Sequence, residues 1–299
     1  MSKKLFALLF VMLMLCGAAL ADGITVTDMH GREIVLDQPA TRIVALTPSA
    51  CEILCAIGCE AALVGRGKYC DYPESISALP VVQSGAETNI EEILALDPQV
   101  VLMSDMSQTE EQAKLLEQNG VKVVISDAND IAGVYTAIRM IGALMAKDDA
   151  AEALIGDMQA TFDEIAAKSE KSGKTIYFEV SPLQWGLWTA GSGTFMDELA
   201  TMCGVTNAFA DISGWQSVSE EQVIERNPDY IVSIAGMGDT AVEEIMGRDG
   251  WGDIGAVKNG RVYNADSNAI SRPGPRLKDA AIELYHFLND DEAEEAPAA

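Results

Sequence analysis

NIEEILALDPQVVL, residues 89–102, is the stretch that decides the fold, because the chain repeats its pattern at residues 219–232 as SEEQVIERNPDYIV. Each copy opens with a good helix N-cap, Asn89 or Ser219. Three residues later comes Glu92 or Gln222, which is the spacing of a capping box. The proline that both copies share ends the short helix, and the β-branched run after it predicts a buried strand. The sequence therefore predicts the same helix–strand unit in each half of the chain.

Further segments extend this unit in the same order in both halves. NGVKVVI (119–125) and NGRVY (259–263) each predict a glycine turn that leads into a strand. Each half also opens with a predicted strand, RIVAL (42–46) in the first and TIYFEV (175–180) in the second. Helices and strands that alternate in this way predict a parallel α/β sheet in each half.

Residues 148–171 connect the two halves and have helical periodicity, with Gly156 as the one glycine or proline among them. A helix of this length reaches ~36 Å, about the width of a domain. We therefore predict an α/β fold of two Rossmann-like lobes joined by a long rigid α-helix, with a ligand cleft between the lobes where their strand ends face each other. The expected parts are a signal peptide (1–21), an N-terminal α/β lobe (22–147), the interdomain helix (148–171), a C-terminal α/β lobe (172–289) and an acidic disordered tail (290–299).

The first residues predict export. Lys3 and Lys4 precede an apolar run, and Ala19-Leu20-Ala21 supplies the small residues that a signal peptidase requires, so we expect cleavage after Ala21. Two alternatives are a retained anchor and lipid attachment at Cys16. The second is less favoured because Leu15, rather than a small residue, precedes the cysteine.

The charge of the chain excludes one class of partner. It carries 46 acidic and 20 basic residues, whereas the phosphates of nucleic acids attract lysine and arginine patches. We expect a monomer that binds a small molecule and no nucleic acid.

Five cysteines follow the predicted cleavage point: Cys51, Cys55, Cys59, Cys70 and Cys203. The first three recur every four residues on one face of a predicted helix, which suits either a soft metal site or a packed core stripe. Packing is favoured because no histidine lies nearby in the sequence. Cys59 and Cys70 are the preferred disulfide, since a bridge between them closes a short loop.

The histidines and glycine motifs argue against an enzyme. His30 and His286 are the two histidines of the chain, and neither has a metal ligand at useful spacing, so no metal site is expected. Gly191-Ser-Gly193 lacks the frame of a nucleophile elbow, and Gly236-Met-Gly238 is a weak nucleotide signal. Catalytic residues and cofactors are therefore not expected, although a secreted enzyme that uses the cleft remains an alternative.

The order and spacing of several motifs resemble one known family. These motifs are TPSACEIL (47–54), YCDYP (69–73), NIE (89–91) with LDPQVV (96–101), VSEEQ (218–222) and RPGPR (272–276). Together they resemble class III periplasmic binding proteins, which serve ABC importers of vitamin B12, haem and ferric siderophores. The resemblance runs from about Ile24 to Leu288. It implies an extracytoplasmic protein that captures a ligand between its lobes and delivers it to a membrane permease.

The resemblance also implies roles for two acidic residues. In this family one glutamate on each lobe docks onto arginines of the permease, and the matching positions are Glu91 and Glu221. Both fall in the first turn of a predicted helix, where the helix dipole favours a carboxylate. The alternative is that they are ordinary N-terminal helix acids.

The implied ligand site combines aromatic residues with arginines. Tyr69 and Tyr72 match on the first lobe and Trp188 and Trp215 on the second, and flat rings suit a corrin, a porphyrin or a catecholate. Arg272 and Arg276 are expected to bind ligand oxygens, although Arg276 has an ion pair within its own lobe as an alternative. Trp251 and Trp185 are candidates for the core. A corrinoid such as cobalamin is preferred to a ferric siderophore, with haem third.

The chain departs from the family pattern at two places. It has Ala50-Cys51-Glu52 where an asparagine commonly precedes a Thr-Glu pair, so ligand contacts there do not carry over. Cys203 matches a position that is disulfide-bonded in some relatives, but the last helix of this chain offers no partner cysteine.

Overall fold

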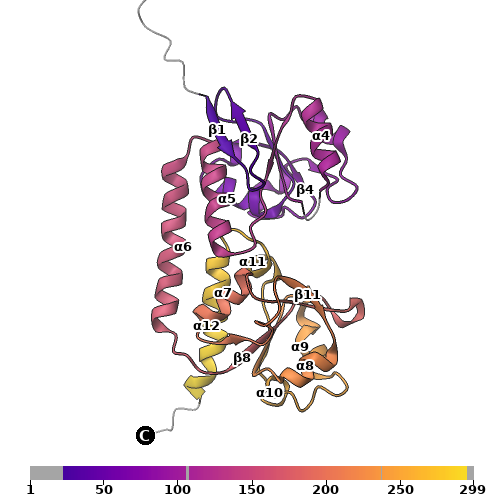
Figure 1. Cartoon of the computed structure of the whole chain (residues 1–299), viewed down its shortest axis with the longest axis vertical. Helices are drawn as coiled ribbons and strands as arrows, with labels where there is room; N and C mark the ends of the chain where they lie inside the picture. The colour runs from indigo at the N-terminus through magenta and orange to yellow at the C-terminus, as the bar shows by residue number, and fades with distance from the viewer. Residues whose placement is uncertain (1–22, 106–107, 237, 295–299) are drawn as a thin grey trace, which may run out of the picture.

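The computed structural model describes residues 23–105, 108–236 and 238–294, so the predicted signal peptide and its alternatives lie outside the described residues. Two lobes are stacked along the long axis of the molecule, and the long helix α6 (Asp148–Lys168) runs beside both of them (Figure 1). No helix within these ranges is long and apolar enough to cross a membrane.

The N-terminal lobe is built on a sheet of five parallel strands in the order β5-β4-β3-β6-β7. Its strands are β3 (Ile43–Ala45), β4 (Leu63–Gly67), β5 (Val81–Val82), β6 (Val100–Met103) and β7 (Lys122–Ile125), and its helices are α2 (Pro48–Ala56), α3 (Ile90–Ala95), α4 (Glu110–Gln118) and α5 (Ile131–Leu144). An antiparallel pair, β1 (Ile24–Thr27) and β2 (Glu33–Leu36), precedes the sheet.

The C-terminal lobe repeats this plan with a parallel sheet in the order β10-β8-β12-β13. Its strands are β8 (Thr175–Glu179), β10 (Thr206–Asn207), β12 (Tyr230–Ser233) and β13 (Val262–Asn264), and its helices are α7 (Phe195–Met202), α8 (Glu220–Arg226), α9 (Ala241–Met246), α10 (Gly255–Lys258), α11 (Ser267–Ser271) and α12 (Leu277–Glu294). The strands β9 (Leu187–Ala190) and β11 (Trp215–Val218) form a separate antiparallel pair.

The repeated sequence unit adopts the same structure in both lobes. The Asn89 side chain accepts a hydrogen bond from the Glu92 N–H at 3.2 Å, and the Ser219 hydroxyl accepts one from the Gln222 N–H at 3.3 Å. At the other end of each helix, the residue before the shared proline turns to a positive φ of 48°, at Asp97 and at its equivalent Asn227. The prediction of two equivalent α/β lobes from this repeat is confirmed.

The connecting helix α6 ends at Lys168, short of the predicted end at residue 171. Ser169 leaves the helical conformation, and its hydroxyl donates to the Ile165 carbonyl at 2.8 Å. The last helix differs in the opposite direction, because α12 continues to Glu294 whereas a disordered tail was expected from residue 290. The first helix breaker in this acidic stretch is Pro297, so the sequence permits the longer helix.

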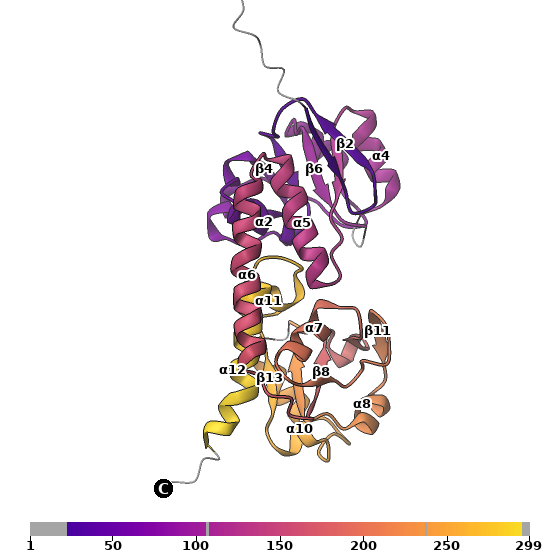
Figure 2. The same cartoon turned by 60° about the vertical axis from the view of Figure 1, so that its left-hand side comes forward.

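The two lobes share one continuous hydrophobic core along α6. This core includes Ile141 of the N-terminal lobe, Met158 and Phe162 of α6, and Leu199 and Leu284 of the C-terminal lobe, all of which are buried. Helix α12 packs beside α6 (Figure 2). Lys278 of α12 forms an ion pair with Asp157 of α6. Lobes that share packed side chains with their connector move as parts of one body, so large hinge motions are disfavoured.

The cysteines correct one prediction and confirm another. Cys59 and Cys70 do not form the predicted disulfide, since both thiols are free. The strand β4 separates them, and its five residues span ~16 Å, far more than the ~7 Å that a disulfide allows between Cα atoms. The predicted core stripe is confirmed: Cys51 and Cys59 are buried in the core, and Cys55 packs against it.

Candidate functional site between the two lobes

A cavity of about 800 Å³ lies between the lobes. Its N-terminal wall comes from the segments that follow the carboxyl ends of all five parallel strands; these segments contribute Leu46, Tyr69, Ser84, Ser104 and Ser126. Parallel strands end at one edge of a sheet, and in open α/β sheets ligands bind outside that edge. The cavity therefore occupies the position that the fold class predicts for a binding site.

The opposite wall carries two tryptophans. Trp188 lies on β9 and Trp215 on the neighbouring strand β11, and both line the cavity. Trp215 is held by Phe195, with the ring centroids 5.5 Å apart. Across the cavity Tyr69 is 66% exposed, and the Lys68 ammonium lies 5.5 Å from the centroid of its ring. Three aromatic rings from both lobes therefore face one space.

Tyr72 does not line the cavity. The guanidinium group of Arg276 lies over its ring, 4.3 Å from the centroid, and pairs the two predicted ligand residues with each other. Such a cation–π contact uses the ring face that was expected to bind ligand.

The two arginines form ion pairs that join the lobes. Arg272 lines the cavity, but its Nη1 lies 2.6 Å from Asp71 and 3.2 Å from Glu52. The Nη2 of Arg276 lies 2.7 Å from the same Glu52 carboxylate. Glu52 belongs to α2 of the N-terminal lobe, so this ion pair of Arg276 crosses between the lobes. A second, longer ion pair joins the Nη1 of Arg276 to Asp266 at 3.7 Å and stays within the C-terminal lobe, as the alternative for Arg276 expected. The hydrogen bond from Arg272 also lowers the pKa of Asp71.

The remaining tryptophans divide between core and surface. Trp251 is fully buried, as expected, and its indole N–H donates to Glu220 at 3.0 Å. Trp185 is 76% exposed at the end of a short 3₁₀ turn, which contradicts its interpretation as a core residue.

The two acids expected to dock onto a permease are both exposed. Glu91 lies in the first turn of α3 and Glu221 in the first turn of α8. The Ser219 side chain hydrogen-bonds to Glu221 and lowers its pKa. Helix α3 contacts α4, and both views place α4 and α8 on the flank away from α6 (Figures 1 and 2). The two helices that carry these acids therefore belong to the same side of the molecule, one on each lobe.

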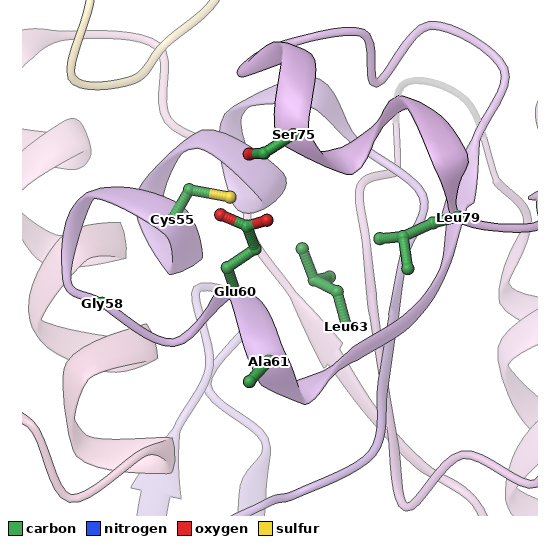
Figure 3. A pocket seen from close by; sticks show the side chains of 7 residues that line it. All are labelled: Cys55, Gly58, Glu60, Ala61, Leu63, Ser75 and Leu79. Carbon is green, nitrogen blue, oxygen red and sulfur yellow. The ribbon is translucent and has the colours of Figure 1, made fainter.

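A second hollow of about 630 Å³ opens on the surface of the N-terminal lobe and shares none of its described lining residues with the first. Figure 3 shows Cys55, Glu60 and Ser75 pointing toward one another in it. Burial, together with the negative charge of Glu60, raises the pKa of Cys55 to about 12. A thiol with this pKa stays protonated at neutral pH and is a poor nucleophile, so this hollow does not provide a catalytic cysteine.

One cluster escaped the sequence analysis. His30 lies beside Asp105 and Asp127, and both aspartates line the cavity between the lobes. The three residues are far apart in the sequence, so spacing alone gave no signal for them. The signal that exists is topological: Asp105 and Asp127 both follow the carboxyl ends of adjacent parallel strands.

Two α/β lobes that share a packed helix and enclose an aromatic cavity define a substrate-binding protein, a class that captures small molecules in its cleft. Residues 43–269 match the model of the periplasmic binding protein family, and the chain belongs to this family.

Similar proteins support this assignment. The chain is 33% identical to an uncharacterized ABC transporter substrate-binding lipoprotein, YvrC, of Bacillus subtilis, over 90% of this chain and 86% of that protein. It is 31% identical to the vitamin B12-binding protein of Salmonella typhi, over 84% and 91% of the two chains. The crystal structure of a possible iron-binding, periplasmic solute-binding protein from Staphylococcus epidermidis matches with a TM-score of 0.73 and 31% identity, covering 84% of this chain and 99% of that one.

Proposed function

We propose that this protein is the extracytoplasmic ligand-capturing component of an ABC importer and that its ligand is a corrinoid of the vitamin B12 type. The observation that carries this proposal is the cavity of about 800 Å³ with Tyr69 on one wall and Trp188 and Trp215 on the other. Aromatic rings bury large flat surfaces at little cost in side-chain entropy, which suits a bulky macrocycle.

The charges around the cavity favour a nearly neutral ligand over an anionic one. Arg272 is the one basic residue among the described lining residues, and it is already paired with Asp71 and Glu52. The same wall carries the carboxylates of Asp105 and Asp127. An anionic ferric siderophore or the propionates of haem would place negative charge against these acids, with no free arginine to compensate it. The nearly neutral corrin of cobalamin would not place such a charge there. The curated relative that binds vitamin B12 agrees with this choice.

Calorimetric titration of the mature protein with cyanocobalamin, a ferric catecholate, a ferric hydroxamate and haem tests the ligand class. We expect one corrinoid to bind per monomer and to quench tryptophan fluorescence. Binding of haem or a siderophore without binding of the corrinoid would refute the proposed ligand but keep the role in import. A ligand recovered chemically altered would refute the role as a carrier.

Two tryptophans provide a matched pair of variants. Trp215→Ala removes a ring that lines the cavity, and we expect the affinity for the corrinoid to fall by roughly tenfold or more, since buried aromatic anchors dominate such sites. Trp185→Ala removes an exposed ring that is not among the lining residues, and its affinity should stay at the wild-type value. If both variants lost the same affinity for the corrinoid, the proposal that the cavity tryptophans bind it would be refuted.

We also propose that the chain is exported, with cleavage after Ala21. Mass spectrometry of the protein recovered from the producing cell tests this. A mature N-terminus at residue 22 supports cleavage, whereas a lipid-modified N-terminus at Cys16 identifies a lipoprotein instead.

A further inference from the structure

His30, Asp105 and Asp127 form a cluster at the cavity that neither the family nor the proposed ligand explains. The Nε2 atom of His30 lies 3.0 Å from an oxygen of Asp127 and 3.3 Å from an oxygen of Asp105. One potential ligand atom from each residue lies within 4.8 Å of the other two. Three donor atoms at this spacing fit around a single metal ion.

The backbone holds these three residues in place from three separate segments. His30 lies in the turn between β1 and β2, and its N–H donates to Asp28 at 3.0 Å. Met29 of the same turn donates to the Ile125 carbonyl at 3.2 Å, which fastens the turn to the end of β7. Asp105 donates its own N–H to both carboxylate oxygens of Asp127, at 3.1 and 3.2 Å. The cluster is therefore ordered by contacts that do not depend on an ion.

The donor set selects a class of metal. One imidazole nitrogen with two carboxylate oxygens is a borderline set that suits zinc, manganese or ferrous iron, whereas calcium and magnesium take oxygen ligands alone. Three protein ligands leave at least one coordination position open. Because Asp105 and Asp127 line the cavity, the open positions face the space between the lobes.

We propose that His30, Asp105 and Asp127 bind one divalent transition-metal ion in the N-terminal wall of the cavity. The ion neutralises the two carboxylates of that wall and presents its open positions to an oxygen or nitrogen donor of the captured molecule. The site does not depend on which molecule the protein imports, but an occupied site would remove the negative charge that disfavours an anionic ligand. The ligand titrations are therefore made on the chelator-stripped protein, so that the metal site and the proposed ligand are tested separately.

Titration of the tag-free, chelator-stripped protein with Zn²⁺ by calorimetry tests the site. We expect one Zn²⁺ per chain with a dissociation constant in the micromolar range. His30→Ala and Asp105→Asn should each weaken binding at least roughly tenfold. Both side chains are substantially exposed, at 40% and 63%, so we expect both variants to fold.

Matched controls come from the C-terminal lobe. His286→Ala removes the other histidine, and Asp253→Asn removes another exposed aspartate; both should bind Zn²⁺ like the wild type. The proposal is overturned if Zn²⁺ does not bind in the micromolar range, or if His30→Ala and Asp105→Asn bind it as well as the controls do. Binding of Ca²⁺ in preference to Zn²⁺ would overturn the assigned class of metal.

Discussion

At the scale of single residues, Asp28 illustrates how one buried carboxylate organises an edge of the cavity. It accepts hydrogen bonds from the N–H groups of His30, Arg32 and Ile125, at 3.0, 2.9 and 3.1 Å, and it forms an ion pair with the Arg32 guanidinium at 2.8 Å. Burial alone would raise its pKa, but these hydrogen bonds and the arginine outweigh burial, so the pKa of Asp28 is lowered. The carboxylate ties the β1–β2 turn to β7 and so positions His30.

We expect Asp28→Asn to destabilise the protein by about 2 kcal/mol at neutral pH. The asparagine amide would place its own N–H donor next to N–H groups that donate to the Asp28 carboxylate, and some of these would lose their acceptor. A carboxylate with a lowered pKa stabilises the folded state above its unfolded pKa of about 3.9, and this contribution is lost as the pH falls through the folded value. The difference between the two proteins should therefore be constant from neutral pH to about pH 5 and shrink below about pH 4. Urea unfolding across this range measures it, and a difference that grew on acidification would contradict the assignment.

The aromatic residues of the cavity were more predictable than its charges. Tyr69, Trp188 and Trp215, three of the four aromatic residues that the resemblance implied for the ligand site, line the cavity. The partners of Arg272 and Arg276 could not be predicted. Their shared partner Glu52 lies more than 200 positions away in the sequence, and no local pattern specifies a contact of that range.

At the scale of helices and strands, local signals were sufficient wherever the structure depends on local contacts. Capping residues, a helix-ending proline and β-branched runs determined both copies of the repeated unit. The Cys59–Cys70 pairing failed because a short separation in sequence ignores the extended strand β4 between the two residues. Short loops favour disulfides only when the chain between the cysteines turns back.

The contact between α2 and the α11–α12 segment gives a prediction at this scale. Glu52→Gln removes the negative charge that Arg272 and Arg276 share, and the Glu52 side chain is 2% exposed. Loss of this carboxylate leaves Arg272 paired with Asp71 and Arg276 paired with Asp266, so the buried charge is compensated only in part. We therefore expect the free energy of unfolding to fall by about 2 kcal/mol.

Glu164→Gln is the control, because it removes an acid that pairs with Lys168 on the exposed face of α6 and should leave the urea midpoint unchanged. If the two variants unfolded at the same urea concentration, the ion pairs between the lobes would make no measurable contribution to the stability of the protein.

At the scale of the whole molecule, two features set what the lobes can do. The core that continues through α6 and the ion pairs at Glu52 both hold the lobes together, so we expect ligand capture with only modest closure. A body of nearly constant shape also keeps the exposed acids of α3 and α8 at a fixed separation. A fixed pair of anions, one on each lobe, suits a permease with two equivalent subunits, because a symmetric partner presents the same basic surface twice.

This geometry predicts that substitutions can abolish docking onto the permease without changing the capture of the ligand. Glu91→Arg and Glu221→Arg each place a cation where the permease is expected to present arginines. Like charges brought together at an interface should weaken docking by roughly 100-fold and reduce transport to background. The affinity for the ligand in solution should not change, because neither residue lines the cavity.

Asp149→Arg is the matched control: it reverses another exposed acid in the first turn of a helix, but on α6, away from the flank that carries α4 and α8. Transport into cells or vesicles that carry the permease, measured beside calorimetry on the same variants, distinguishes the outcomes. If Asp149→Arg abolished transport as the other two are expected to do, the loss would follow from net charge. If Glu91→Arg or Glu221→Arg weakened capture in solution, these acids would belong to the ligand site and not to the docking surface.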